Sequence, residues 1–195
     1  MSTFDGGLYT RITDLAQHAP HWLDNVITFW SNYGLALFAV LMLVAWWRAR
    51  NDSAERMATA LAVPVIVVVA YLANDVIKML FHEQRPCQTL HTVTLDTCPA
   101  LGDWSFPSNH SAIAGAAAVA LFIAYRRLAV IAIPAALLMA ASRVWVGVHY
   151  PHDVVIGLLT GILVAWPLAL LARRAAPAVD RLRDTRLKPL LVATG

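Results

Sequence analysis

The sequence has few charged residues and few cysteines, and both scarcities limit what the protein can be. Only 14% of its 195 residues are charged and 59% are hydrophobic, whereas an ordinary soluble domain is roughly 25% charged. A soluble domain of this size cannot bury so much apolar surface. Two cysteines are too few for a disulfide-rich secreted scaffold, and so apolar a chain does not stay disordered. The composition therefore predicts an integral membrane protein.

Long runs with little or no charge are what the sequence does contain. Crossing a bilayer as a helix takes about 20 mostly apolar residues. Five runs approach that length, at residues 25–47, 57–81, 104–125, 128–147 and 154–172. They are closely spaced and leave no room for a separate soluble domain. The pattern predicts five transmembrane helices.

The segment before the first run is polar, but it has helical periodicity. Leu8, Ile12 and Leu15 recur three to four residues apart, which favours an amphipathic helix lying in the membrane interface; a frayed terminus is the alternative. We therefore expect an all-α integral-membrane bundle of five to six helices. Residues 1–24 form its N-terminal interfacial segment, residues 25–174 its membrane domain, and residues 175–195 a basic cytoplasmic tail.

The basic residues indicate an orientation rather than a nucleic-acid partner, although the net charge is +3. Lys and Arg gather in the cytoplasmic loops of membrane proteins. Eleven of the fifteen fall on one side of the alternating spans: Arg48, Arg50, Arg56, Arg126, Arg127, Arg173, Arg174, Arg181, Arg183, Arg186 and Lys188. This distribution predicts a multi-pass protein of the plasma membrane whose other face is extracytoplasmic. It gives no reason to expect nucleic acid as a partner.

Three of the remaining basic residues lie near the outward ends of the spans, in segments rich in ionisable groups. These segments read KMLFHEQRP from Lys78, PSNH from Pro107 and SRVWVGVHYPHD from Ser142. Ionisable residues are costly in a membrane and usually mark a function. The outward ends of the predicted helices are therefore the candidate site.

The residue types in these segments suit an oxyanion. Lys78, Arg85 and Arg143 would supply three positive charges, and arginine matches phosphate oxygens with two parallel hydrogen bonds. The Ser108 hydroxyl could donate a further bond. The backbone N–H groups of Asn109 and His110 would face an anion at the start of a helix. We expect these residues to bind phosphate.

Two histidines in these segments are candidates for covalent catalysis. His149 and Asp153 are four residues apart, so on a helical turn the carboxylate can fix the imidazole tautomer and leave the other nitrogen free to attack. His110, from a different segment, could protonate the leaving oxygen. We interpret the other histidines as ordinary interfacial residues: His18, His21, His82, His91 and His152. No metal is expected, because HYPHD lacks a pair of histidines four residues apart and the three cations would repel an ion.

The three segments resemble the signature of the type 2 phosphatidic acid phosphatase superfamily, in order and in internal spacing: Lys78 to Arg85–Pro86, then Pro107 to His110, then Arg143 to His149 and Asp153. The likeness is greatest to its small bacterial undecaprenyl-diphosphate phosphatases of the bacitracin-resistance type. One position departs from the signature, because Asn109 replaces the usual glycine and adds a side chain near the phosphate.

This resemblance implies a lipid phosphatase that works without a cofactor through a phosphohistidine. By carry-over, His149 is the nucleophile, Asp153 its orienting partner and His110 the general acid. Polyprenyl diphosphates are the expected substrates, and phosphatidylglycerol phosphate or phosphatidate the alternative. A transporter is a different class, but the ionisable groups lie at one level and no internal repeat is present. The sequence leaves open whether Cys87 and Cys98, in one outward connection, form a disulfide.

Overall fold

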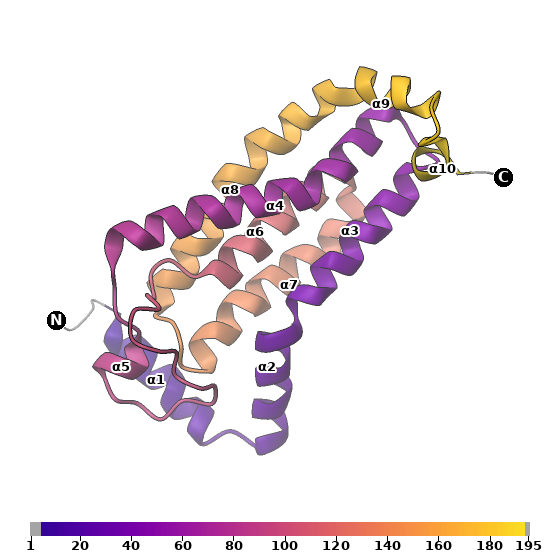
Figure 1. The fold of residues 1–195 in the computed structure, drawn as a ribbon. Coiled ribbons are helices and arrows are strands. Elements are labelled where there is room, and N and C mark those ends of the chain that lie inside the picture. Colours follow the sequence, from indigo (N-terminus) through magenta and orange to yellow (C-terminus); the bar gives the residue numbers. More distant parts are fainter. Residues whose placement is uncertain (1–4, 194–195) are drawn as a thin grey trace.

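The computed structural model describes residues 5–193, and all regular structure in that range is helical (Figure 1). This confirms the all-α prediction. The helices are α1 (Gly6–Gln17), α2 (His21–Tyr33), α3 (Leu35–Ala49), α4 (Ala54–Phe81), α5 (Pro86–Thr89), α6 (Asn109–Ala124), α7 (Arg126–Trp145), α8 (Pro151–Ala172), a 3₁₀ turn (Arg173–Ala175), α9 (Ala176–Arg183) and α10 (Lys188–Leu191).

The bundle is built around α6, which packs against α4, α7 and α8. Small residues allow this close packing, because α6 is rich in alanine and α8 presents glycines to it. A Cβ added at Gly157 would meet the carbonyl oxygen of Ser108, and one at Gly161 would meet that of Ala112. The close approach at Gly157 brings the start of α6 against the first turns of α8, where two of the three signature segments meet.

Two of the predicted spans differ in shape from a single straight helix. The run at 25–47 is divided between α2 and α3, which bend by 53° at Gly34. The run at 104–125 contributes a helix of only 16 residues, because residues 104–108, which include Pro107, precede the helix as irregular chain with a bend. Among the described residues α4, α7 and α8 are long and apolar enough to cross a membrane, and the bent pair would make a fourth crossing.

The N-terminal helix α1 lies at the same end of the bundle as α5 and the 82–108 connection (Figure 1). It buries Tyr9, Thr13 and Ala16, while Leu8 and Leu15 remain exposed. The Tyr9 hydroxyl donates to the carbonyl of Gly147 at 2.9 Å. Leu8 and Leu15 thus lie on the outward side of the helix, and the neighbouring face, about 100° around, holds the helix on the protein.

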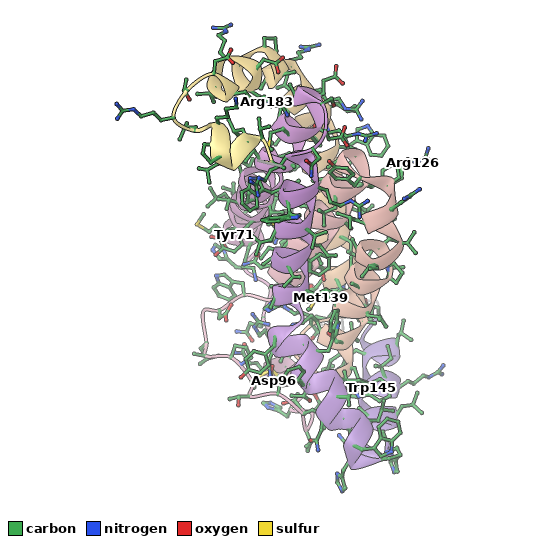
Figure 2. All side chains as sticks on the ribbon, turned by 90° about the vertical axis from the view of Figure 1, so that its right-hand side faces the viewer. Tyr71, Asp96, Arg126, Met139, Trp145 and Arg183 are labelled. Carbon is green, nitrogen blue, oxygen red and sulfur yellow. A yellow bond between two sulfur atoms is a disulfide. The ribbon has the colours of Figure 1, made fainter. Side chains whose placement is uncertain are left out.

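The basic residues named above gather at the other end of the molecule. Arg126 and Arg183 lie at one end in Figure 2, and Asp96 and Trp145 lie at the other. There α9 packs on α4, and the Trp46 indole donates to the carbonyl of Leu190 at 3.0 Å. Charge is therefore divided between two ends that are separated by the length of the bundle.

Candidate active site

The fold brings the three signature segments together at the end that carries α1 and α5. Lys78 lies in the last turn of α4, and Arg85 immediately precedes α5. Ser108, Asn109 and His110 begin α6. Arg143 lies in the last turn of α7, His149 in the turn that follows it, and Asp153 in the first turn of α8. All eight predicted site residues thus reach one end of the bundle from four helices and two connections.

A tight turn between α7 and α8 positions His149. Gly147 has φ +89°, a conformation that residues with a Cβ rarely adopt. A Cβ at this position would also lie 2.5 Å from the Thr94 methyl carbon. Since the helices on both sides are packed in the bundle, this glycine sets where the His149 imidazole enters the interior.

The His149 imidazole is buried beside Asp153, with 2% and 0% of the two residues exposed. His149 Nδ1 lies 3.2 Å from Asp153 Oδ2. The same carboxylate oxygen accepts hydrogen bonds from the Tyr150 backbone N–H at 2.8 Å and from the Ser105 hydroxyl. The predicted pairing is present, and Ser105 is a further member of it that spacing along the sequence does not reveal.

The contacts of His149 determine which ring nitrogen holds the proton. Nε2 lies 3.2 Å from the Arg85 guanidinium, which can only donate, so Nε2 is the acceptor and Nδ1 carries the hydrogen. Burial, followed by the positive charges of Arg85, Arg143 and Lys78 and by His110, holds the pKa of His149 well below its ordinary value. The imidazole is therefore neutral, with its lone pair on the side of the cations.

Backbone carbonyls fix the directions of two of these cations. The Lys78 ammonium donates to the carbonyl of Trp104 at 2.8 Å. Arg85 donates to the carbonyls of Asp103 and Val148 at 2.9 and 3.0 Å, and also pairs with the exposed Asp103 carboxylate at 2.9 Å. The carbonyls orient these groups without neutralising them, so much of the positive charge remains available to an anion.

The third cation, Arg143, retains an unused donor. Its guanidinium donates to the Ser31 hydroxyl at 2.6 Å and lies 3.7 Å from the Asp96 carboxylate. Its Nε and the Ser108 hydroxyl are both buried and have no hydrogen-bond partner in the described part of the chain. Buried donors are normally paired, and an oxyanion between them would supply acceptors for both.

The Asn109 side chain is held by two residues of α4, the helix that also carries Lys78. Its Oδ1 accepts from Asn74 at 2.6 Å, and its Nδ2 lies 3.5 Å from the carboxylate of Asp75 on the same helix, α4. Asn74 on α4 thus fixes the direction of this side chain at the start of α6. The Asn109 backbone N–H remains at the start of α6 as a donor for an anion.

His152 is not the ordinary interfacial histidine that its sequence position suggested. Its ring has 15% side-chain exposure and contacts carboxylates from three segments: Asp5 at 3.0 Å, Glu83 at 3.1 Å and Asp153 at 3.3 Å. The prediction was wrong because Asp5 and Glu83 reach the histidine only through the fold. Glu83, His152 and Asp153 also have metal-ligand atom types within 4.8 Å of one another, but both ring nitrogens of His152 already face carboxylates.

The structure decides the question about the cysteines. Cys87 and Cys98 are joined in a disulfide. The bridge closes the part of the 82–108 connection that follows Arg85 and precedes Asp103. It thereby limits the movement of the segment that supplies one cation and its exposed partner.

Taken with the apolar bundle, this geometry defines a class of protein: a membrane phosphatase with three cations beside a neutral imidazole. We call these cations, Lys78, Arg85 and Arg143, the cationic cage of His149. Residues 59–176 match the family model described as the PAP2 superfamily, and the chain belongs to that family. It is 28% identical to the undecaprenyl-diphosphatase BcrC of Bacillus subtilis over 89% of this chain and 86% of the relative. It is also 28% identical to an undecaprenyl-diphosphatase of Sulfolobus acidocaldarius, with coverages of 74% and 68%.

Solved structures share the fold. The PAP2-type phosphatidylglycerolphosphate phosphatase of Bacillus subtilis superposes with a TM-score of 0.62 at 22% identity, over 87% of this chain and 85% of that one. LpxE of Aquifex aeolicus gives a TM-score of 0.63 at 23% identity, with coverages of 88% and 96%. The predicted family, the membrane-bundle fold and the hydrolase class are thus confirmed.

Proposed function

We propose that the protein removes the terminal phosphate of a polyprenyl diphosphate, undecaprenyl diphosphate in bacteria, at the outer face of the plasma membrane. The product is the lipid monophosphate, which cell-wall synthesis reuses as its carrier. The observation that carries the proposal is the set of three buried cations and two unpaired buried donors beside a neutral imidazole. A diphosphate carries more negative charge than a phosphate monoester, which suits this cage. Relatives named undecaprenyl-diphosphatase cover most of the chain.

In the proposed first step, His149 Nε2 attacks the terminal phosphorus. A P–N bond forms, and the bond from phosphorus to the bridging oxygen breaks. His110, which the negative charge of the bound diphosphate keeps protonated, gives its proton to that oxygen, so the lipid monophosphate leaves. Asp153 stabilises the positive charge that develops on the His149 ring. Lys78, Arg85, Arg143, Ser108 and the Asn109 backbone N–H hold the transferred phosphoryl oxygens, where negative charge is greatest.

In the second step, water hydrolyses the phosphohistidine. The His110 ring, now unprotonated, accepts a proton from the water as its oxygen attacks phosphorus. The P–N bond breaks, inorganic phosphate leaves and His149 becomes neutral again. No residue in this sequence of steps needs a metal, so activity is expected to survive EDTA; loss with EDTA and recovery with a divalent metal would refute the scheme.

A substrate panel in detergent tests the lipid assignment. Undecaprenyl diphosphate, phosphatidylglycerol phosphate, phosphatidate and diacylglycerol diphosphate should be compared by kcat/KM with the purified full chain. We expect undecaprenyl diphosphate to be preferred. If a glycerophospholipid phosphate is hydrolysed more than about tenfold better, which corresponds to about 1.4 kcal/mol in transition-state binding, the polyprenyl assignment is wrong and only the phosphatase class stands.

Labelling of single cysteines tests the proposed orientation. In a background with Cys87 and Cys98 changed to serine, Leu101→Cys lies at the site end and Asn51→Cys at the basic end; both positions are exposed. A membrane-impermeant thiol reagent applied to intact cells should label only position 101. Labelling of position 51 instead would place the site on the cytoplasmic face.

A further inference from the structure

We infer that His152 is a positioning residue: as an imidazolium, it stabilises the charge on the second oxygen of Asp153 and thereby orients His149. This inference rests on the proposed function, because it assigns a role within the same site. It starts from one observation that the proposed mechanism does not use. A ring in the first turn of α8 lies among three carboxylates from three separate segments.

The contacts of the ring identify its protonation state. Nδ1 lies 3.0 Å from an oxygen of Asp5, and Nε2 lies 3.1 Å from Glu83 Oε2 and 3.3 Å from Asp153 Oδ1. A neutral imidazole has one N–H and would direct a lone pair at one of these carboxylates. Only the imidazolium places a hydrogen toward both sides. Among residues 5–193, the charged groups that face it are Asp5, Glu83 and Asp153.

The ring is also held from its faces and from its own backbone. It stacks on Tyr150 with ring centroids 5.5 Å apart and an interplanar angle of 15°, and it lies 5.7 Å from the Phe106 ring. The His152 backbone N–H donates to Asp5 at 2.8 Å. A ring fixed in this way presents Nε2 to the carboxylates in one direction only.

The consequence for the reaction follows from the two oxygens of Asp153. Oδ2 holds His149, Tyr150 N–H and Ser105, whereas Oδ1 is buried and makes no hydrogen bond among the described residues. A fully buried carboxylate stays ionised only if opposite charge or hydrogen bonds compensate its lost hydration. The His152 cation supplies that compensation to Oδ1, while Asp5 and Glu83 anchor the cation to α1 and to the 82–108 connection.

The test compares His152→Gln with His91→Gln, a control at an exposed position in the 82–108 connection. His152→Gln should lower kcat by about tenfold and leave KM within about twofold, because an interaction used only in the transition state changes kcat rather than binding. The control should retain wild-type constants. Wild-type kcat in His152→Gln, or a loss confined to KM, would overturn the inference.

A double variant shows whether His152 acts through Asp153. In an Asp153→Asn background, adding His152→Gln should have no further effect on the residual turnover, measured with ³²P-labelled substrate over long incubations. The same tenfold loss in that background would show an independent role and refute the inference. Asp5→Asn provides a second variant that leaves α8 unchanged: kcat should fall by about threefold, since the ring loses one of its anchors. Unchanged kcat in Asp5→Asn would also count against it.

A spectroscopic measurement separates this inference from the proposed function. The ¹⁵N shifts of the His149 ring report which nitrogen carries the proton, without any substrate. Wild-type protein should show the Nδ1–H form, and His152→Gln should shift part of the population to Nε2–H. If turnover of every lipid is absent while this shift occurs, the proposed function fails and the positioning role stands; no shift refutes the positioning role alone.

Discussion

The two ends of the bundle both carry clustered cations, but they hold them in different ways. At the site end, Lys78, Arg85 and Arg143 are 5–8% exposed. They donate to backbone carbonyls or to a serine hydroxyl, and the two arginines also lie near carboxylates, Asp103 at 2.9 Å and Asp96 at 3.7 Å. At the other end, the Arg56 side chain is 56% exposed and pairs with Asp52 at 2.6 Å, and the Arg50 guanidinium lies 4.7 Å from the centre of the Trp47 ring.

This difference separates the proposed binding site from the end whose charges we expect to set the orientation in the membrane. An exposed ion pair contributes about 0–1 kcal/mol and is screened by salt. A buried cation whose charge is incompletely offset is unfavourable by itself, so an arriving anion gains more from it. The number of arginines at an end therefore says little. What distinguishes the proposed anion site is the burial of its cations, because donors without an acceptor among the described residues occur at both ends, Arg143 Nε at one and Arg50 Nε and Arg183 Nε at the other.

The largest expected effect tests the buried end at its centre. His149→Ala should lower kcat on the order of 10³-fold or more, because it removes the nucleophile of the proposed reaction. His91→Gln, at an exposed position, should leave kcat unchanged. Lipid phosphate release by the purified variants measures both. Retention of more than a tenth of the wild-type rate by His149→Ala would remove the phosphohistidine from the mechanism.

Replacing one arginine at each end compares the two environments directly. Arg143→Gln should reduce kcat/KM by about 10²-fold, the usual cost of losing one donor to transition-state charge. Arg126→Gln, at the basic end, should change kcat/KM by less than about twofold, since a solvated surface charge contributes little. Steady-state assays with undecaprenyl diphosphate give both values. Equal losses would show that burial does not distinguish the two ends.

A pair of serines sharpens the comparison. Ser105→Ala should lower kcat by about tenfold, because Asp153 loses a hydrogen bond of the kind that a charge strengthens. Ser53 caps α4 at the basic end, where its hydroxyl accepts from the Arg56 backbone N–H at 3.3 Å. Ser53→Ala should lower the free energy of unfolding by about 1 kcal/mol and leave kcat unchanged. Thermal unfolding and turnover, measured on the same samples, separate the two effects.

Loss of the Cys87–Cys98 disulfide should change the free energy of unfolding more than it changes turnover. Changing Cys87 and Cys98 together to serine should lower the free energy of unfolding by about 3 kcal/mol, because the bridge limits the unfolded chain. Turnover at low temperature should fall only a few-fold, since Arg85 keeps its carbonyl partners. Wild-type thermal stability in this double variant would contradict the expectation.

The smallest expected change is in the titration of His149. Because burial and the nearby cations lower its pKa, its ring resonance should stay in the neutral form as the pH falls through about 6.5, the ordinary histidine value. The unfolded chain binds that proton more readily, so this residue favours unfolding as the pH drops below that value. NMR of ¹³C-labelled histidine, with His149→Ala for assignment, provides the measurement. A resonance that titrates near 6.5 would show the ring to be solvated.

Much of the fold and most of the site could be predicted from the sequence, because both depend on local pattern. Long apolar runs form helices in a membrane since no other local structure satisfies the backbone there. The spacing from Arg143 to His149 and Asp153 places those groups around one turn. The contact between His149 and Asp153 could be predicted because the two residues are four apart at the start of a helix.

Only the tertiary structure decided the contacts between segments far apart in the chain. Ser105 reaches Asp153, Asn74 binds the Asn109 side chain, and Asp5 meets His152 across 147 positions. No periodicity encodes such pairs, because they depend on how closely α6 and α8 pack and on where the 82–108 connection returns. The sequence by itself determined which residues could do the chemistry; the packing of the helices determined which of them are buried, paired and charged.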